Sequence, residues 1–143
     1  RFLPYVVETA VGVERTVLIA LLDAYTEENI DGNERVFLGL DPRIAPTKVA
    51  VFPLMKKEGL PELATGLYED LRRAAIPSFY DMAGSIGRRY RRQDEAGTPW
   101  CVTVDKQTIE DGTVTIRDRD SLSQERISVE MVCDWVSHRL SNV

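Results

Sequence analysis

The sequence predicts an α/β fold with a mixed sheet, and three observations support it. From Lys48 onward, short apolar runs alternate with helical periodicities, which is typical of parallel strands joined by helices. Turn signals at Asp111-Gly112 and at Asp120–Ser123 predict antiparallel strands at the end of the same sheet. The 143 residues, of which 43% are hydrophobic and 29% charged, have the composition of a globular domain.

The first part of the chain predicts a strand, a helix and a second strand. Phe2–Glu8 is rich in β-branched and aromatic residues, which favours a strand. Val11–Tyr25 has helical spacing, and its apolar residues surround the helix, so we expect burial on every side. The polar run Thr26–Gly32 is typical of a turn, and Arg35–Leu40 predicts a short strand.

Pro42 and Pro46 bracket a stiff connector, so we divide the chain into residues 1–41 and residues 42–143. In the second part we expect the order β-α-β-α-β-β-β-α. Its strands are expected at Lys48–Leu54, Ile76–Asp81, Pro99–Asp105, Thr113–Arg119 and Gln124–Ser128. Its helices are expected at Leu60–Ala75, Ser85–Ala96 and Val129–Leu140.

Composition excludes several classes of protein. The two cysteines, Cys101 and Cys133, and the single His138 do not stand at ligand spacing, so we expect no zinc site and no disulfide scaffold, and a reducing, cytoplasmic setting. The longest apolar run, Val17–Leu22, is too short to cross a bilayer. Because the chain begins at Arg1 rather than Met, we expect it to be part of a longer protein.

Gly84–Gly97 carries the strongest local charge. Four arginines occupy five positions around Tyr90. Arginine pairs with phosphate and stacks on bases, and a tyrosine ring offers a further stacking surface. The neighbouring Asp94 and Glu95 leave a local positive excess in a chain whose net charge is −5. Two interpretations stay open, namely polyanion binding and a solvated helix whose arginines pair with these two acids.

Helical spacing divides this segment between two faces. The exposed face is expected to hold Arg88, Arg91, Arg92 and Glu95. Only Ile86, Tyr90 and Ala96 are available to face the core. The Gly84–Gly87 turn could accept a phosphate on its backbone N–H groups, but an ordinary turn with Ser85 as the N-cap is favoured.

The run Thr113–Asp120 alternates between the two faces of a strand. Arg117 and Arg119 share one face, and Asp118 and Asp120 share the other. Structural ion pairs are favoured for the two aspartates. For the two arginines, ion pairing and base reading both stay open. No catalytic constellation is present in residues 47–143.

Several of these segments resemble class II aminoacyl-tRNA synthetases. Glu8–Arg15 (ETAVGVER) resembles their third signature motif. Asp41–Pro46, leading into Lys48–Leu54, resembles the start of their C-terminal anticodon-binding domain. Gly84–Asp105 followed by Glu110–Ile127 is similar to the homodimeric glycyl-tRNA synthetase family in particular.

The resemblance implies a three-layer α/β/α anticodon-binding fold with a five-stranded mixed sheet and three helices. Residues 1–41 would be the end of a catalytic domain, and residues 42–143 would bind the anticodon loop of glycine tRNA. The whole protein would be a homodimer that attaches glycine to tRNA with ATP and Mg²⁺. Because the first two class II motifs are absent, we expect the chain by itself to have no catalytic residues, no cofactor and no synthetase activity.

The resemblance also implies site residues. The glycine pocket would be lined by Glu8, Thr9, Ala10 and Gly12. ATP would meet Gly12, Val13, Glu14 and Arg15, with Arg15 on the adenine. Ala10 stands where the family often has serine, so a hydroxyl partner for the substrate is missing there. The anticodon would be bound by Arg88, Arg89, Tyr90, Arg91, Arg117 and Arg119.

Two other functions are weighed against this one. The same fold can serve as a protein-interaction module of an accessory subunit that binds no tRNA. A nucleotide-binding α/β enzyme domain is disfavoured, because Lys56–Gly59 (KKEG) follows the first strand in place of a glycine-rich phosphate loop.

Overall fold

The computed structural model describes residues 1–30, 32–57 and 59–142, and its centre is a five-stranded mixed sheet. The strands are β3 (Val49–Pro53), β4 (Ser78–Tyr80), β5 (Trp100–Val104), β6 (Thr113–Asp118) and β7 (Gln124–Ser128). They lie in the order β4-β3-β5-β6-β7. β3 is parallel to β4 and β5, whereas β6 is antiparallel to β5 and β7. The mixed sheet and all five strands that were expected in it are confirmed.

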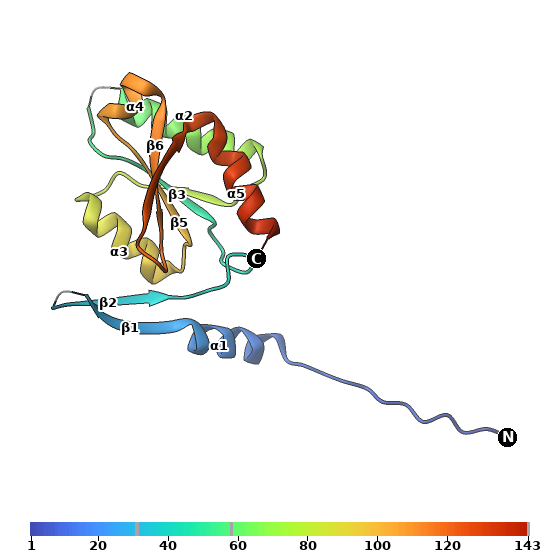
Figure 1. Ribbon diagram of the computed structural model, residues 1–143. Coiled ribbons are helices and arrows are strands. Elements are labelled where there is room, and N and C mark those ends of the chain that lie inside the picture. Colours follow the sequence, from blue (N-terminus) through green and yellow to red (C-terminus); the bar gives the residue numbers. More distant parts are fainter. Residues whose placement is uncertain (31, 58, 143) are drawn as a thin grey trace.

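Three helices complete the layers. α2 (Leu60–Arg73) and α5 (Val132–Ser141) cover one face of the sheet, and α3 (Ile86–Ala96) covers the other (Figure 1). A short 3₁₀ turn, Val129–Met131, leads into α5. The predicted α/β/α arrangement is therefore confirmed.

The two faces of the sheet are packed differently. Under α2, the leucine stripe that includes Leu67 and Leu71 meets the valines of β3 and β5, and these side chains form the main apolar core. Under α3 the apolar cluster is small, with Ala50, Phe52 and Cys101 buried and the ring of Tyr90 packed against them. Because burial of apolar area drives folding, the α2 and α5 side supplies most of the stabilisation, and α3 needs other contacts.

A helix that the sequence analysis did not expect, α4 (Lys106–Asp111), follows β5. Asp105 caps it, since its Oδ1 accepts a hydrogen bond from the Thr108 amide at 3.2 Å, and the Thr108 hydroxyl in turn accepts one from the Asp105 amide at 3.0 Å. This reciprocal capping box is readable as Asp-x-x-Thr in the sequence. Arg126 of β7 also donates to the Asp105 carboxylate, at 2.7 Å to Oδ2, and so fixes the cap to the sheet.

The N-terminal part contains α1 (Val13–Ala24) and a hairpin of β1 (Tyr25–Ile30) and β2 (Asn33–Leu38). The expected helix and second strand are confirmed. The expected turn at residues 26–32 is wrong, because residues 26–30 pair antiparallel with β2; Asp31 lies outside the described residues. A strand whose residues are mostly polar gives no periodic apolar signal, and only the cross-strand partner reveals it.

Two further expectations for this part are wrong. Residues 1–12 form neither helix nor strand, and Phe2 and Tyr5 are 87% and 100% exposed. β-branched composition alone does not make a strand, because the backbone needs a hydrogen-bonded neighbour. The expected burial of the helix on every side is also wrong, since Ala24 is its one buried residue. Figure 1 shows the N-terminal segment and α1 reaching away from the sheet.

We predict that a shortened chain beginning at Pro46 folds and is monomeric. All residues of the main core lie between Val49 and Leu140, so the deletion removes none of them. The full chain is expected to self-associate, because large apolar side chains such as Ile19 and Leu22 are 65% and 68% exposed on α1. Light scattering and circular dichroism on both chains test this, and an unfolded shortened chain or a monomeric full chain would contradict it.

We predict that Asp105→Ala lowers the free energy of unfolding by about 1 kcal/mol or more, the usual value of a helix N-cap. Asp105→Asn should lower the free energy of unfolding by less, because the asparagine side chain can still cap the helix. Hydrogen bonding by Arg126 holds the pKa of Asp105 below its ordinary value. The contribution of the Asp105 carboxylate to the free energy of unfolding is therefore present above about pH 4, and it is lost as pH falls through the lowered pKa. Urea titrations across acidic pH measure it, and Glu110→Ala on the exposed side of α4 is the control.

Candidate nucleic-acid interface

The arginines of α3 fall into two groups. The face expected to be exposed is confirmed, and it holds Arg88, Arg91, Arg92 and Glu95. The inward face holds Arg89, Gln93 and Asp94, all buried, beside the partly buried Ile86 and Tyr90. Ala96, expected to face the core, is exposed instead. Sequence reasoning treated the inward face as apolar and missed three polar residues on it.

Two of the exposed arginines are available to a ligand. The side chains of Arg88 and Arg91 form no hydrogen bond, ion pair or ring contact with any residue in the part of the chain that the structure describes. Arg92 is anchored, because its Nε donates to Asp81 Oδ2 at 3.2 Å and its Nη2 donates to the Ala83 carbonyl at 2.7 Å. Burial favours the neutral acid, but hydrogen bonds from the Ala83 amide and Arg92 outweigh it and lower the pKa of Asp81. Among the exposed arginines of α3, the unpaired positive charge therefore lies on Arg88 and Arg91.

The buried Asp94 is the centre of an ion-pair cluster. Both of its carboxylate oxygens accept hydrogen bonds from Arg117 of β6, at 2.9 and 3.0 Å. Arg35 of β2 donates from its Nε to the same carboxylate at 3.0 Å and also pairs with Glu28. The interpretation in which Asp94 pairs with the arginines of its own helix is wrong, since its partners come from two distant strands.

Tyr90 joins this cluster rather than lying open as a stacking surface. Its hydroxyl hydrogen-bonds to the Thr103 hydroxyl at 2.6 Å, and its ring lies 5.4 Å from that of Phe52, edge to face. The Arg117 guanidinium lies over the ring, 4.8 Å from its centre. Burial raises the pKa of Tyr90. Arg117 is thus held by a carboxylate and an aromatic ring at once.

Arg89 and Arg119 are buried and bind backbone carbonyls. Arg89 donates from Nη2 to the Gly84 carbonyl at 3.0 Å and from Nη1 to that of Pro53. Arg119 donates to the carbonyls of Gly97 at 2.8 Å and Leu40 at 2.9 Å. With exposed fractions of 3% and 2%, these two arginines fix the loops around them.

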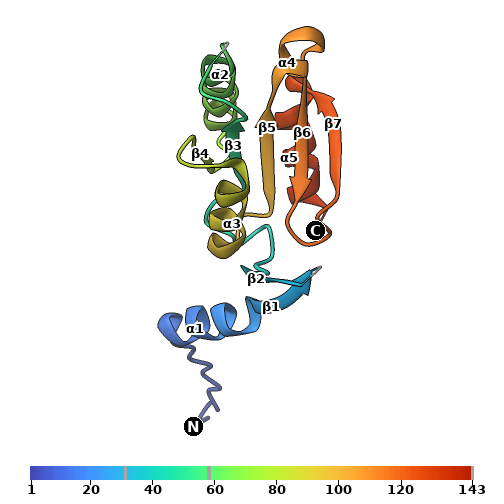
Figure 2. The same cartoon turned by 90° about the vertical axis from the view of Figure 1, so that its left-hand side faces the viewer.

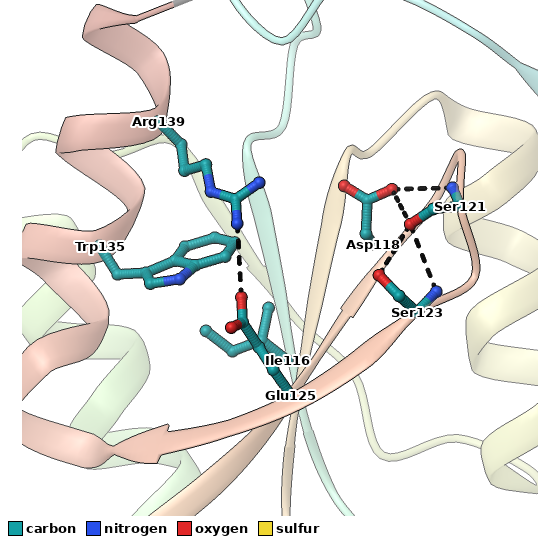
Figure 3. Close-up of a pocket in the computed structure, with 7 residues that line it drawn as sticks. All are labelled: Ile116, Asp118, Ser121, Ser123, Glu125, Trp135 and Arg139. Atoms are coloured by element: carbon teal, nitrogen blue, oxygen red, sulfur yellow. Dashed lines mark hydrogen bonds and ion pairs between the residues drawn. The ribbon is translucent and has the colours of Figure 1, made fainter.

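The two aspartates of the β6–β7 turn differ. Asp120 pairs with its neighbour Arg119 at 2.7 Å, as expected. Asp118 instead accepts hydrogen bonds from the Ser121 amide and hydroxyl, both at 2.9 Å, and so closes the turn. Figure 3 shows this turn facing Trp135 and Arg139 of α5 across a cavity of about 240 Å³.

The segment expected to meet glycine and ATP lies in solvent. Glu8, Thr9, Ala10 and Gly12 belong to the stretch of residues 1–12 without regular structure, and Val13, Glu14 and Arg15 form the first turn of α1. All seven are exposed. Gly12 occupies the N-cap position, and its carbonyl accepts a hydrogen bond from the Thr16 amide at 3.1 Å.

The described residues lack two kinds of feature. Across residues 1–30, 32–57 and 59–142, no cluster of three or more histidine, cysteine, aspartate or glutamate side chains is arranged to hold a metal ion. Over the same ranges, no helix has the length and apolar character needed to traverse a bilayer. Cys101 and Cys133 are free thiols, and burial raises the pKa of both.

Comparison with known proteins gives one family match. Residues 48–139 match the model of the anticodon binding domain. Over 99% of its length the chain is 48% identical to glycine–tRNA ligase of Borreliella burgdorferi and 52% identical to that of Thermobifida fusca. It is 51% identical over 98% of its length to glycine–tRNA ligase of Chlorobaculum tepidum. The chain spans about a third of the length of these relatives, 30 to 32%.

We predict that Asp94→Asn lowers the free energy of unfolding by about 3–5 kcal/mol, because it leaves Arg117 buried without its anion. The neighbouring Glu95→Gln is the matched control, since Glu95 is exposed, and it should change stability by less than about 0.5 kcal/mol. Urea denaturation of the full chain measures both. Equal stability of the two variants would show that the cluster does not hold the fold.

Proposed function

Because this chain belongs to the anticodon binding domain family, we propose that residues 42–143 bind the anticodon loop of a tRNA, and that this tRNA is the one for glycine. The observation that carries the proposal is the family match over residues 48–139. Identity of about 50% to glycine–tRNA ligases from three bacteria supports the choice of glycine.

The surface of α3 gives this proposal a physical basis. Arg88 and Arg91 offer unpaired guanidinium groups, and guanidinium is the side chain best suited to paired hydrogen bonds with phosphate. Of the residues expected to bind the anticodon, we therefore assign the RNA contacts to these two. We assign positioning to the other four, because each already forms hydrogen bonds within the domain: Arg89, Arg117, Arg119 and Tyr90.

We also propose that residues 1–41 are the end of the catalytic domain of a longer, homodimeric, cytoplasmic protein that attaches glycine to tRNA with ATP and Mg²⁺. The exposed Glu8 and Arg15 fit one edge of such a site, since a carboxylate suits the ammonium group of an amino acid and a guanidinium suits stacking on adenine. The described residues do not include a set of ligands for the metal. No step of the reaction is assigned to this chain alone.

We predict that Arg88→Ala and Arg91→Ala each weaken binding of an anticodon stem-loop of glycine tRNA. Each lost phosphate contact should reduce the slope of log affinity against log salt by roughly 0.7. Fluorescence anisotropy over a series of salt concentrations measures the slope. The matched control is Arg72→Ala, an exposed arginine on α2, on the opposite side of the sheet.

The same assay contains the outcome that contradicts the proposal. A stem-loop with a shuffled loop sequence should bind more weakly than the glycine sequence. Equal affinity for both would contradict recognition of the glycine loop, and no change in slope for either variant would show that these two arginines do not contact the RNA. No binding of either stem-loop would favour the protein-interaction module that the fold can also serve.

A further inference from the structure

A groove runs between the edge strand β4 and helix α3, which lie next to each other in Figure 2. Its volume is about 560 Å³, within the usual range for small-ligand pockets. It is lined by Thr47, Phe79, Asp81, Ala83, Arg92, Gln93 and Ala96, and mainly apolar atoms face the space. None of the expected anticodon residues lines it.

Phe79 is the aromatic wall of this groove. It stands opposite Ala50 of β3, on the face of the sheet that α3 covers, and it is 45% exposed. The core does not require it there, since the apolar cluster under α3 is closed by Phe52 and Tyr90. A half-exposed ring at the edge of a sheet offers one π-face for stacking.

Polar groups stand around this ring in fixed positions. Arg92 is held by Asp81 and by the Ala83 carbonyl, which leaves its Nη1 without a partner among the residues that the structure describes. Gln93 Oε1 accepts a hydrogen bond from the Thr98 hydroxyl at 2.7 Å, and this orients the amide. Its Nε2 has no partner within the same described ranges. The groove thus combines an aromatic face with two preset hydrogen-bond donors.

We propose that this groove holds one unstacked nucleobase of the bound RNA loop, with the base on the Phe79 ring and its acceptor atoms toward Arg92 and Gln93. The inference rests on the proposed function and extends it to a second surface of the domain. The positive charge beside the groove favours RNA over an apolar peptide as the occupant. Arg88 lies one helical turn before Arg92 on the same exposed face, so a phosphate next to the base finds a free guanidinium there.

The test uses the full chain and the anticodon stem-loop of glycine tRNA, intact or with one loop nucleotide at a time made abasic. Phe79→Ala should weaken binding of the intact loop roughly 5- to 150-fold, the range expected for loss of one base–aromatic stack. At one loop position the abasic change should weaken the wild-type chain but add nothing to the loss in Phe79→Ala. Phe79→Tyr should restore affinity, because it keeps the ring.

The controls separate this site from the arginine contacts and from misfolding. Leu63→Ala is the matched variant, because Leu63 is also 45% exposed but lies on α2, and it should bind RNA like the wild type. The salt slope should be unchanged in Phe79→Ala, since stacking neutralises no phosphate. Urea denaturation should show that the Phe79→Ala variant is folded.

Three results would overturn the inference. If the wild-type chain does not bind the stem-loop, the proposed function fails and this site fails with it. If the slope depends on Arg88 while Phe79→Ala binds RNA normally, the base site alone is wrong. If Phe79→Ala abolishes self-association or peptide binding and leaves RNA affinity unchanged, the groove is a protein-docking site.

Discussion

The buried carboxylate of Asp94 is the contact on which the arrangement of this chain depends. It binds Arg117 of β6 through both oxygens and Arg35 of β2 through one, and so joins helix, sheet and hairpin at one point. A buried charge is costly unless it is paired, so Asp94 requires an arrangement in which Arg117 of the same domain reaches it. Arg35 adds a second partner that ties the hairpin to this point. Apolar packing beneath α3 is too small to impose such a restriction.

The polar inner face of α3 determines what its outer face can do. Arg89 and Gln93 are also bound inward, to backbone carbonyls and to Thr98. With these residues fixed, Arg88 and Arg91 are directed away from the domain and keep unpaired charge, although the chain as a whole carries a net charge of −5. Local cationic character on an acidic domain concentrates positive potential on the surface that these two arginines occupy.

The far end of the same helix binds the N-terminal part. Gly97 ends α3 with φ +80°, and a Cβ there would lie 2.8 Å from a methyl carbon of Leu40. Glycine is required both by the left-handed conformation and by this close approach. Arg119 closes the junction by donating to the Leu40 carbonyl at 2.9 Å. One helix therefore bears the hairpin at its C-terminal end and the free arginines nearer its start.

The sequence by itself determined the α/β/α layers, since α2, β3 and β5 carry local apolar patterns whose period depends only on the element that forms. It also determined that Arg88 and Arg91 would be exposed. It did not separate Arg89 and Arg117 from them, and it missed Arg35, β1 and the groove at Phe79. An arginine has the same local sequence pattern whether its guanidinium faces water or a buried carboxylate. Only the tertiary structure decides between these two environments, because Asp94 and its partners Arg35 and Arg117 come from distant parts of the chain.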